Sequence, residues 1–204
     1  RRRATLTCLA AGLLTAALPA VSAAAYPDKP IRLVVPFPPG QGADILARLI
    51  GQHLAAALGQ PIVVENKVGA GGIIGTAFAA KAAPDGYTLY MGSSGPLAIG
   101  PHVYKAVGFD TLKDFAPISN IASVTQVLVT APASQLASAK DVVERARAQP
   151  GMVPFGSAGS GTTSHLTMEL FTQMSGISLS HVPYKGSSTS MIDVMAGRVP
   201  LMFD

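Results

Sequence analysis

Three glycine-rich segments each follow an apolar run and precede a helical pattern, so their backbone groups are free to bind a ligand. They are residues 36–42 (PFPPGQG), 92–96 (GSSGP) and 156–165 (GSAGSGTTSH). In open α/β proteins, ligands bind beyond the carboxyl ends of the strands, and free N–H groups at a helix N-terminus attract anions. We interpret the segments as walls of an anion-binding site; the alternative is that they are only tight strand-to-helix turns.

Nucleotide-binding and hydrolase motifs each fail at a single residue. The run that starts at Gly69 has Ile74 where a dinucleotide fingerprint requires its third glycine. Residues 156–161 have the spacing of a phosphate-binding loop, but Thr162 stands at the lysine position. Ala158 interrupts the nearest G-x-S-x-G nucleophile motif. These enzyme classes are therefore disfavoured.

Metal and acid–base chemistry also lack the residues they need. The sequence holds one cysteine, Cys8, and four histidines without metal-ligand spacing, at positions 53, 102, 165 and 181. No two acidic residues share a loop as an acid–base pair. A serine-dependent hydrolase stays open as an alternative, but in the pair Ser164–His165 adjacent helical residues do not face each other. We expect no metal, no cofactor and no catalysis.

The hydrophobic pattern predicts strands that alternate with helices. The expected strands are residues 31–35, 62–65, 87–91, 124–130, 153–156, 177–182 and 199–203, and the expected helices end near residues 58, 83, 148, 174 and 196. Alternation of this kind predicts parallel sheets. Residues 31–100 and 124–204 form two such groups joined by a less regular stretch, which predicts two α/β lobes with a cleft between them.

Composition and charge exclude several classes of protein. The chain has 204 residues, of which 49% are hydrophobic and 13% charged, which excludes a disordered chain. The net charge is +4, but Arg1, Arg2 and Arg3 supply three of the 15 basic residues, and no acid precedes Asp28. The rest of the chain is nearly neutral, so nothing indicates a nucleic-acid partner.

Residues 1–25 have the pattern of a cleaved signal peptide. Three arginines precede an apolar run, and Ala23 to Ala25 form a small-residue cleavage site after Pro19. The alternative, a transmembrane anchor, needs a longer apolar run. We expect cleavage after Ala25, or a residue or two earlier, and export to the periplasm. The chain starts with arginine and ends at Asp204 within a strand-like run, so we also expect residues to be missing at both ends.

Six segments in series resemble the Bug/TctC family, the periplasmic solute receptors of tripartite tricarboxylate transporters. They are YPDKPIRLVVPFPPGQGAD, LGQPIVVENKVGAGG, KAAPDGYTLYMGSSG, KDFAPIS, PFGSAGSGTTSHLTMELF and HVPYKGSSTSMIDVMAGRVPLMFD. The resemblance implies an α/β fold like that of type II periplasmic binding proteins, with two lobes around a cleft, here incomplete. After the signal peptide, residues 26–105 would form the first part of lobe 1 and residues 106–204 an unfinished lobe 2. The remainder of lobe 2 and the return to lobe 1 would be missing.

The resemblance also implies a function. Members of the family capture a small carboxylate by lobe closure: a tricarboxylate, a dicarboxylate, an acidic amino acid or an aromatic acid. They deliver it to integral membrane transporter subunits and are not enzymes. For this chain the implied state is a periplasmic monomer with no nucleic-acid partner. A receptor that presents its ligand to a signalling partner remains open as an alternative.

Two sets of ligand-binding residues follow from the resemblance. In the first lobe they are Phe37, Pro38, Gly40, Gln41, Gly42, Asp44, Ser93 and Ser94. In the second lobe they are Ser157, Ala158, Gly159, Ser160, Thr162, Thr163, His165, Tyr184 and Asp204. Gln41 departs from the family, which usually has a glycine there. Either Gln41 takes an ordinary backbone conformation, or it reshapes the loop and points its amide at the ligand.

Overall fold

A computed structural model describes residues 25–204, so the predicted signal peptide lies almost entirely outside the described residues. The first half of the described chain builds a three-stranded parallel sheet in the order β2-β1-β3. Its elements are β1 (Ile31–Val35), α2 (Gly42–Leu58), β2 (Ile62–Asn66), η1 (Ala70–Gly72), α3 (Ile73–Ala80) and β3 (Thr88–Tyr90). A π-helical turn, η2 (Gly95–Ile99), and the short α4 (Gly100–Val103) follow.

Apolar spacing explains why this half folds as it does. β1 and α2 pack together in one hydrophobic core. Its buried residues are Leu33 and Val35 of β1, Ala47 of α2, and Met91, which follows β3. Helix α2 ends where Gly59 adopts the left-handed conformation (φ 68°) and its N–H bonds to the oxygen of Ala55. The core thereby fixes the loop between β1 and α2 at the carboxyl edge of the sheet.

The second half builds a four-stranded sheet in the order β4-β7-β5-β6. Its elements are β4 (Leu128–Thr130), η3 (Pro132–Ser134), α5 (Ala139–Ala148), β5 (Pro154–Ser157), α6 (Thr163–Ser175), β6 (Ser180–Pro183), α7 (Ser187–Met195) and β7 (Leu201–Phe203). Helices α5 and α6 pack on one face around Phe155 and Met168, and α7 packs on the other against Met202. β4 runs antiparallel to β7, whereas the other pairs are parallel.

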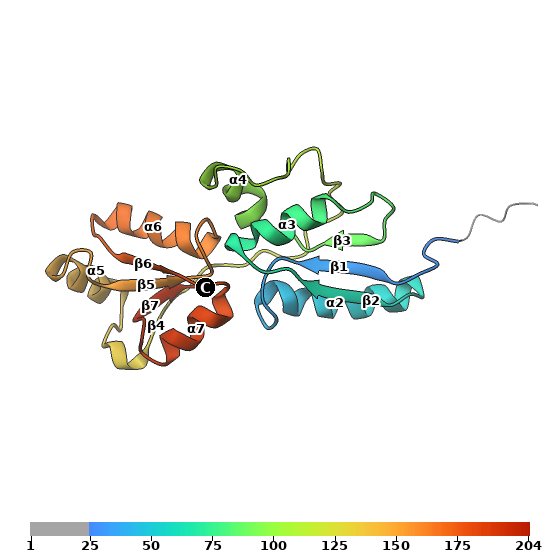
Figure 1. The fold of residues 1–204 in the computed structure, drawn as a ribbon. Helices are drawn as coiled ribbons and strands as arrows, with labels where there is room; N and C mark the ends of the chain where they lie inside the picture. Colours follow the sequence, from blue (N-terminus) through green and yellow to red (C-terminus); the bar gives the residue numbers. More distant parts are fainter. Residues whose placement is uncertain (1–24) are drawn as a thin grey trace, which may run out of the picture.

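Figure 1 shows the two sheets at opposite sides of the molecule, with loops from both meeting between them. Residues 104–127 connect the halves without a helix or strand. The predicted boundary between the two lobes, at residues 105/106, falls in this connection. That boundary stays a prediction. Of the helices that the structure describes, none is both long and apolar enough to cross a membrane.

Three elements are shorter than the sequence predicts, for local reasons. The helix expected to reach residue 83 ends at Ala80, because the residue before Pro84 is disfavoured in a helical conformation. The strand expected over 124–130 spans only Leu128–Thr130, because its partner β7 has three residues. β6 begins at Ser180 rather than at 177. Helix α5 begins with a capping box, in which Ser138 and Asp141 each accept a backbone N–H of the other.

Candidate functional site

The loops singled out from the sequence meet at the junction of the two halves. The Tyr104 hydroxyl donates to the backbone oxygen of Ser160 at 2.8 Å. The hydroxyls of Ser94 and Thr163 lie 3.3 Å apart. At a third point, the backbone N–H of Ser187 donates to the side chain of Gln41. The three predicted glycine-rich loops and the start of α7 therefore share one region of the molecule (Figure 1).

Glycines let these loops approach closely. A Cβ on Gly71 would lie 2.5 Å from the backbone oxygen of Ser160, and one on Gly159 would lie 3.4 Å from the Cα of Gly71. Gly71 also has a positive φ of 61°, which suits glycine. On the same surface, a Cβ on Gly95 would lie 3.5 Å from the Cα of Thr162. The contact between the halves is thus built backbone against backbone.

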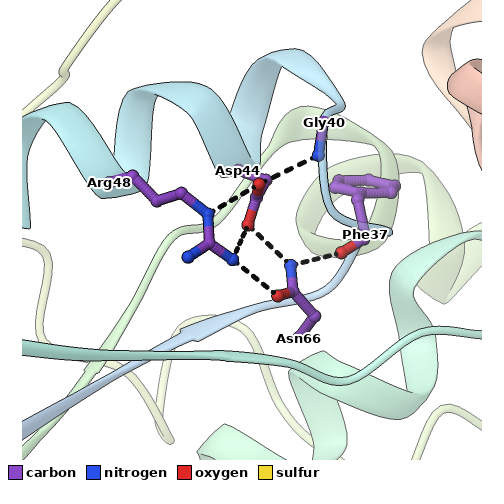
Figure 2. A network of polar contacts seen from close by, with 5 residues as sticks. All are labelled: Phe37, Gly40, Asp44, Arg48 and Asn66. Carbon is purple, nitrogen blue, oxygen red and sulfur yellow. Dashed lines mark hydrogen bonds and ion pairs between the residues drawn. The ribbon is translucent and has the colours of Figure 1, made fainter.

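The first loop is held by a buried carboxylate at the start of α2. Asp44 is 2% exposed, and it accepts the backbone N–H of Gly40 at 2.9 Å. Its two oxygens also accept from Arg48 at 2.9 and 3.0 Å and from the Asn66 amide at 2.9 Å. The same Asn66 amide donates to the backbone oxygen of Phe37. Figure 2 shows how these residues converge on the loop from α2 and β2.

This network explains the charge state of Asp44. Burial alone would raise the pKa of Asp44, but hydrogen bonds from Arg48, Asn66 and the Gly40 N–H outweigh it and lower the pKa to about 2. The carboxylate is ionised and its oxygens are already occupied by donors of its own chain. Asp44 therefore positions the loop, and the atoms left for a ligand belong to the loop backbone and to Gln41.

The structure shows which backbone conformation Gln41 adopts at the position where the family usually has glycine. It has φ −80° and ψ 154°, an extended conformation open to any residue, and it is the N-cap of α2. Its side-chain oxygen accepts the N–H of Ser187 at 3.2 Å. Gln41 thus keeps an ordinary backbone while its amide reaches the other half of the molecule.

The loop between β5 and α6 is held by its own hydroxyls. The Ala158 N–H donates to the Ser164 hydroxyl at 2.9 Å, and the Gly159 N–H donates to the Ser157 hydroxyl at 3.1 Å. The Thr162 hydroxyl donates to the backbone oxygen of Gly159 at 2.6 Å. Ser157 and Ser164 are buried, so they shape the loop. Helix α6 then begins with no side-chain cap and no acidic residue in its first turn.

Beneath this loop lies a histidine that the sequence analysis did not select. His181 Nε2 lies 2.6 Å from the Ser157 hydroxyl. The His181 ring stacks on His165, with ring centres 4.0 Å apart, and on Phe155, at 4.8 Å. His181 is the parallel-register partner of Phe155, so a correct pairing of β5 with β6 was the signal that could have found it.

The electrostatics of this stack keep both histidines neutral near pH 7. Burial, and then repulsion from His165, lower the pKa of His181 to about 4. Burial lowers the pKa of His165, partly opposed by the charge of Glu169. The Ser157 hydroxyl is hydrogen-bonded to His181 and also accepts the Gly159 N–H, so that hydroxyl is committed to the loop. In the described chain no carboxylate is hydrogen-bonded to His181, and Ser157 is fully buried. Ser157 and His181 therefore lack the orienting acid and the exposed hydroxyl that a serine nucleophile needs.

Protonation of the stack is expected to destabilise the protein. Since the pKa of His181 is about 4 in the folded state and about 6.5 when unfolded, only the unfolded state takes up a proton between these values. The free energy of unfolding should therefore fall by about 1–2 kcal/mol from pH 6.5 to pH 4, discounted for partial solvent screening. Urea unfolding of the full-length protein across this range measures it. His181→Gln should flatten the slope, whereas His53→Gln, on the exposed face of α2, is the matched control; equal slopes in all three proteins would contradict the expectation.

The remaining predicted residues have other surroundings. The Tyr184 hydroxyl donates to Asp193 at 2.7 Å, and its backbone N–H donates to the oxygen of Ser157. Asp204 is exposed and its backbone pairs with Val127 at the end of the second sheet. Ser93 is half-buried and its backbone oxygen accepts an N–H of the following turn. None of these three side chains makes a hydrogen bond to the other half of the described chain.

Two recessed surfaces of the described chain lie away from this junction. One hollow of about 360 Å³ lies between α2 and β2, and another of about 630 Å³ lies near the amino ends of the first sheet, lined by Lys29, Glu65 and Asp85 among others. Within residues 25–204, no three histidine, cysteine or acidic side chains gather where they could hold a metal ion. The junction remains the place where the candidate residues converge.

Comparison with protein families gives one match over most of the chain. The family described as "Tripartite tricarboxylate transporter family receptor" (TctC) matches residues 46–204. Protein BugT of Bordetella pertussis is 43% identical over 180 residues, which cover 88% of this chain and 55% of BugT. The chain thus spans little more than half the length of this curated relative.

Solved structures show the same fold. A Rhodopseudomonas palustris protein solved with adipate has a TM-score of 0.85 and 38% identity, over 88% of this chain and 60% of its own. MatC of the same species, solved with bound malate, has a TM-score of 0.82 and 28% identity, over 88% of this chain and 61% of its own. The predicted family resemblance and fold class are confirmed, and the family that matches is one of receptors rather than enzymes.

Proposed function

We propose that this chain, which belongs to the tripartite tricarboxylate transporter receptor (TctC) family, is part of a periplasmic receptor that captures a small carboxylate between its two halves. One observation carries the proposal. The N-termini of α2, α6 and α7 lie at the junction of the halves, where Gln41 bonds to Ser187 and Thr163 to Ser94, and the one acid in their first turns, Asp44, is already paired. Helix N-termini favour an anion, so the junction suits a carboxylate.

The chemistry of the junction also suits reversible binding. Its polar groups are backbone N–H groups, hydroxyls and the Gln41 amide, and the described loops carry no arginine. A buried arginine fork would hold a carboxylate more strongly. The family relationship to structures solved with adipate and malate supports a dicarboxylate as the first class to test. Closure of the halves on the ligand would then signal occupancy to integral membrane transporter subunits.

The predicted site residues divide into two roles under this proposal. Asp44 and Ser157 position the two loops through the hydrogen bonds described above, and so does Ser164, which was not among the predicted site residues. Gln41 and Ser160, together with the first-turn groups of α2, α6 and α7, are proposed to face the ligand. Export to the periplasm and a monomeric state belong to the same proposal.

A thermal-shift screen of the full-length protein tests the function. The panel holds malate, adipate, citrate, glutamate and benzoate, each paired with its amide. A carboxylate present at 100 times its dissociation constant should stabilise the folded state by about 2.7 kcal/mol, a rise of several degrees in melting temperature. A shift with one carboxylate class and not with its amides is the expected result. Equal shifts with acids and amides, or calorimetry that detects no carboxylate binding, would contradict the proposal.

A further inference from the structure

Gln41 is the one side chain of the first loop whose polar end bonds to the other half of the molecule. It stands between Gly40 and Gly42, at the N-cap of α2, and its oxygen accepts the N–H of Ser187 at 3.2 Å. Ser187 is the first residue of α7 and is only 6% exposed. The contact therefore joins the N-termini of two helices that belong to different sheets.

Helix α7 depends on this contact because it lacks a cap of its own. Its N-cap is Gly186, which has no side chain to accept an N–H, and its first turn holds no acid. Gly186 also leaves room for the first loop: a Cβ there would lie 2.5 Å from Pro38 Cγ and 2.8 Å from the Gln41 oxygen. The Gln41 amide thus caps α7 from across the junction.

The other end of the same amide is available. Only the oxygen of an amide accepts a hydrogen bond, so the Ser187 N–H fixes which end of Gln41 faces α7. The Gln41 nitrogen carries two N–H groups, and no residue in the described part of the chain accepts from it. Two donors are therefore held at the junction where the N-termini of α2 and α7 meet.

We infer that Gln41 links ligand binding to closure: its oxygen caps α7 in the closed form while its nitrogen donates to an oxygen of the bound carboxylate. The inference rests on the proposed function and assigns a specificity-determining residue to that site. A ligand without an acceptor oxygen at this point would leave the Gln41 N–H groups unpaired, at a cost in affinity. Gln41 would thereby favour ligands that place a carboxylate or hydroxyl oxygen beside α2 and α7.

Gln41→Glu separates the two functions of this side chain, capping α7 and donating to the ligand. Glutamate has nearly the same shape and retains an oxygen that accepts the Ser187 N–H, with added attraction between its charge and the helix N-terminus. It also replaces the two donors by an anionic oxygen that repels a carboxylate. Calorimetry with malate and adipate on the full-length protein should show binding weakened about 100-fold. Gln52→Glu, on the exposed side of α2, makes the same change of charge and should bind within two-fold of the wild type.

Gln41→Gly completes the design by removing both ends of the amide. We expect affinity to fall about 10-fold, less than in Gln41→Glu because no repulsion is added. If the wild type binds and the affinity of Gln41→Glu is within two-fold of it, this inference is overturned and the proposed function stands. Failure of the wild type itself to bind either dicarboxylate would overturn both. An unchanged melting temperature of unliganded Gln41→Glu, which keeps the oxygen that caps α7, shows that its weaker affinity is not caused by misfolding.

Discussion

Asp44→Asn is expected to lower the free energy of unfolding by about 2–3 kcal/mol and to abolish most ligand binding. The two carboxylate oxygens of Asp44 accept four hydrogen bonds, from the Gly40 N–H, two groups of Arg48 and the Asn66 amide. An asparagine must turn its own NH₂ toward two of these donors, which leaves those two donors without an acceptor at a buried position. The loop from Phe37 to Gly40 then loses the contacts that fix it.

Measurement of Asp44→Asn combines urea unfolding with ligand calorimetry on the full-length protein. The wild type should lose stability as the pH falls from about 4 to about 2, because the unfolded carboxyl takes up a proton before the folded one, whose pKa is about 2. Asp44→Asn should lack this acid-induced loss. Asp110→Asn removes a carboxylate that also pairs with a lysine and a backbone N–H but is half-exposed, and little change is expected. Equal losses in the two variants would contradict a special role for the buried network.

Local patterns explain how much of the fold could be read from the sequence. The alternation of β1 and α2 and the end of α2 near residue 58 depend on neighbouring residues, so they were predicted closely. The short strand β4 could not be, because its length is set by the three residues of β7 far along the chain. Its antiparallel direction depends on the same distant pairing.

In the candidate site, too, local features could be predicted from the sequence and long-range contacts could not. The loops were found because glycine-rich turns after strands are visible in sequence, and they do meet at the junction. Asn66 and His181 were missed because each acts on a loop from a neighbouring strand. The carboxyl end of β2 lies beside that of β1, so the register of the parallel pair would have pointed to Asn66. The register between strands that are distant in the chain cannot be read from a single sequence.

Gly71→Ala is expected to weaken carboxylate binding about 100-fold, because the variant should be unable to close. A Cβ at this position would lie 2.5 Å from the backbone oxygen of Ser160 and 3.3 Å from the Tyr104 hydroxyl that bonds to it. Both neighbours belong to the contact between the halves, and a backbone oxygen cannot turn away as a side chain can. An open arrangement has no such conflict, so the alanine disfavours the closed form selectively.

The matched control for Gly71→Ala is Gly59→Ala. Both glycines have a similar positive φ, 61° and 68°, so both alanines carry about the same backbone penalty of 1–2 kcal/mol. Gly59 ends α2 and has nothing within 4 Å of its Cβ position. Both variants should therefore lose similar stability, but only Gly71→Ala should lose affinity for the dicarboxylate and fail to become more compact in small-angle scattering when it is added. If both lose affinity equally, the backbone penalty and not closure explains the result, because that penalty is what the two variants share.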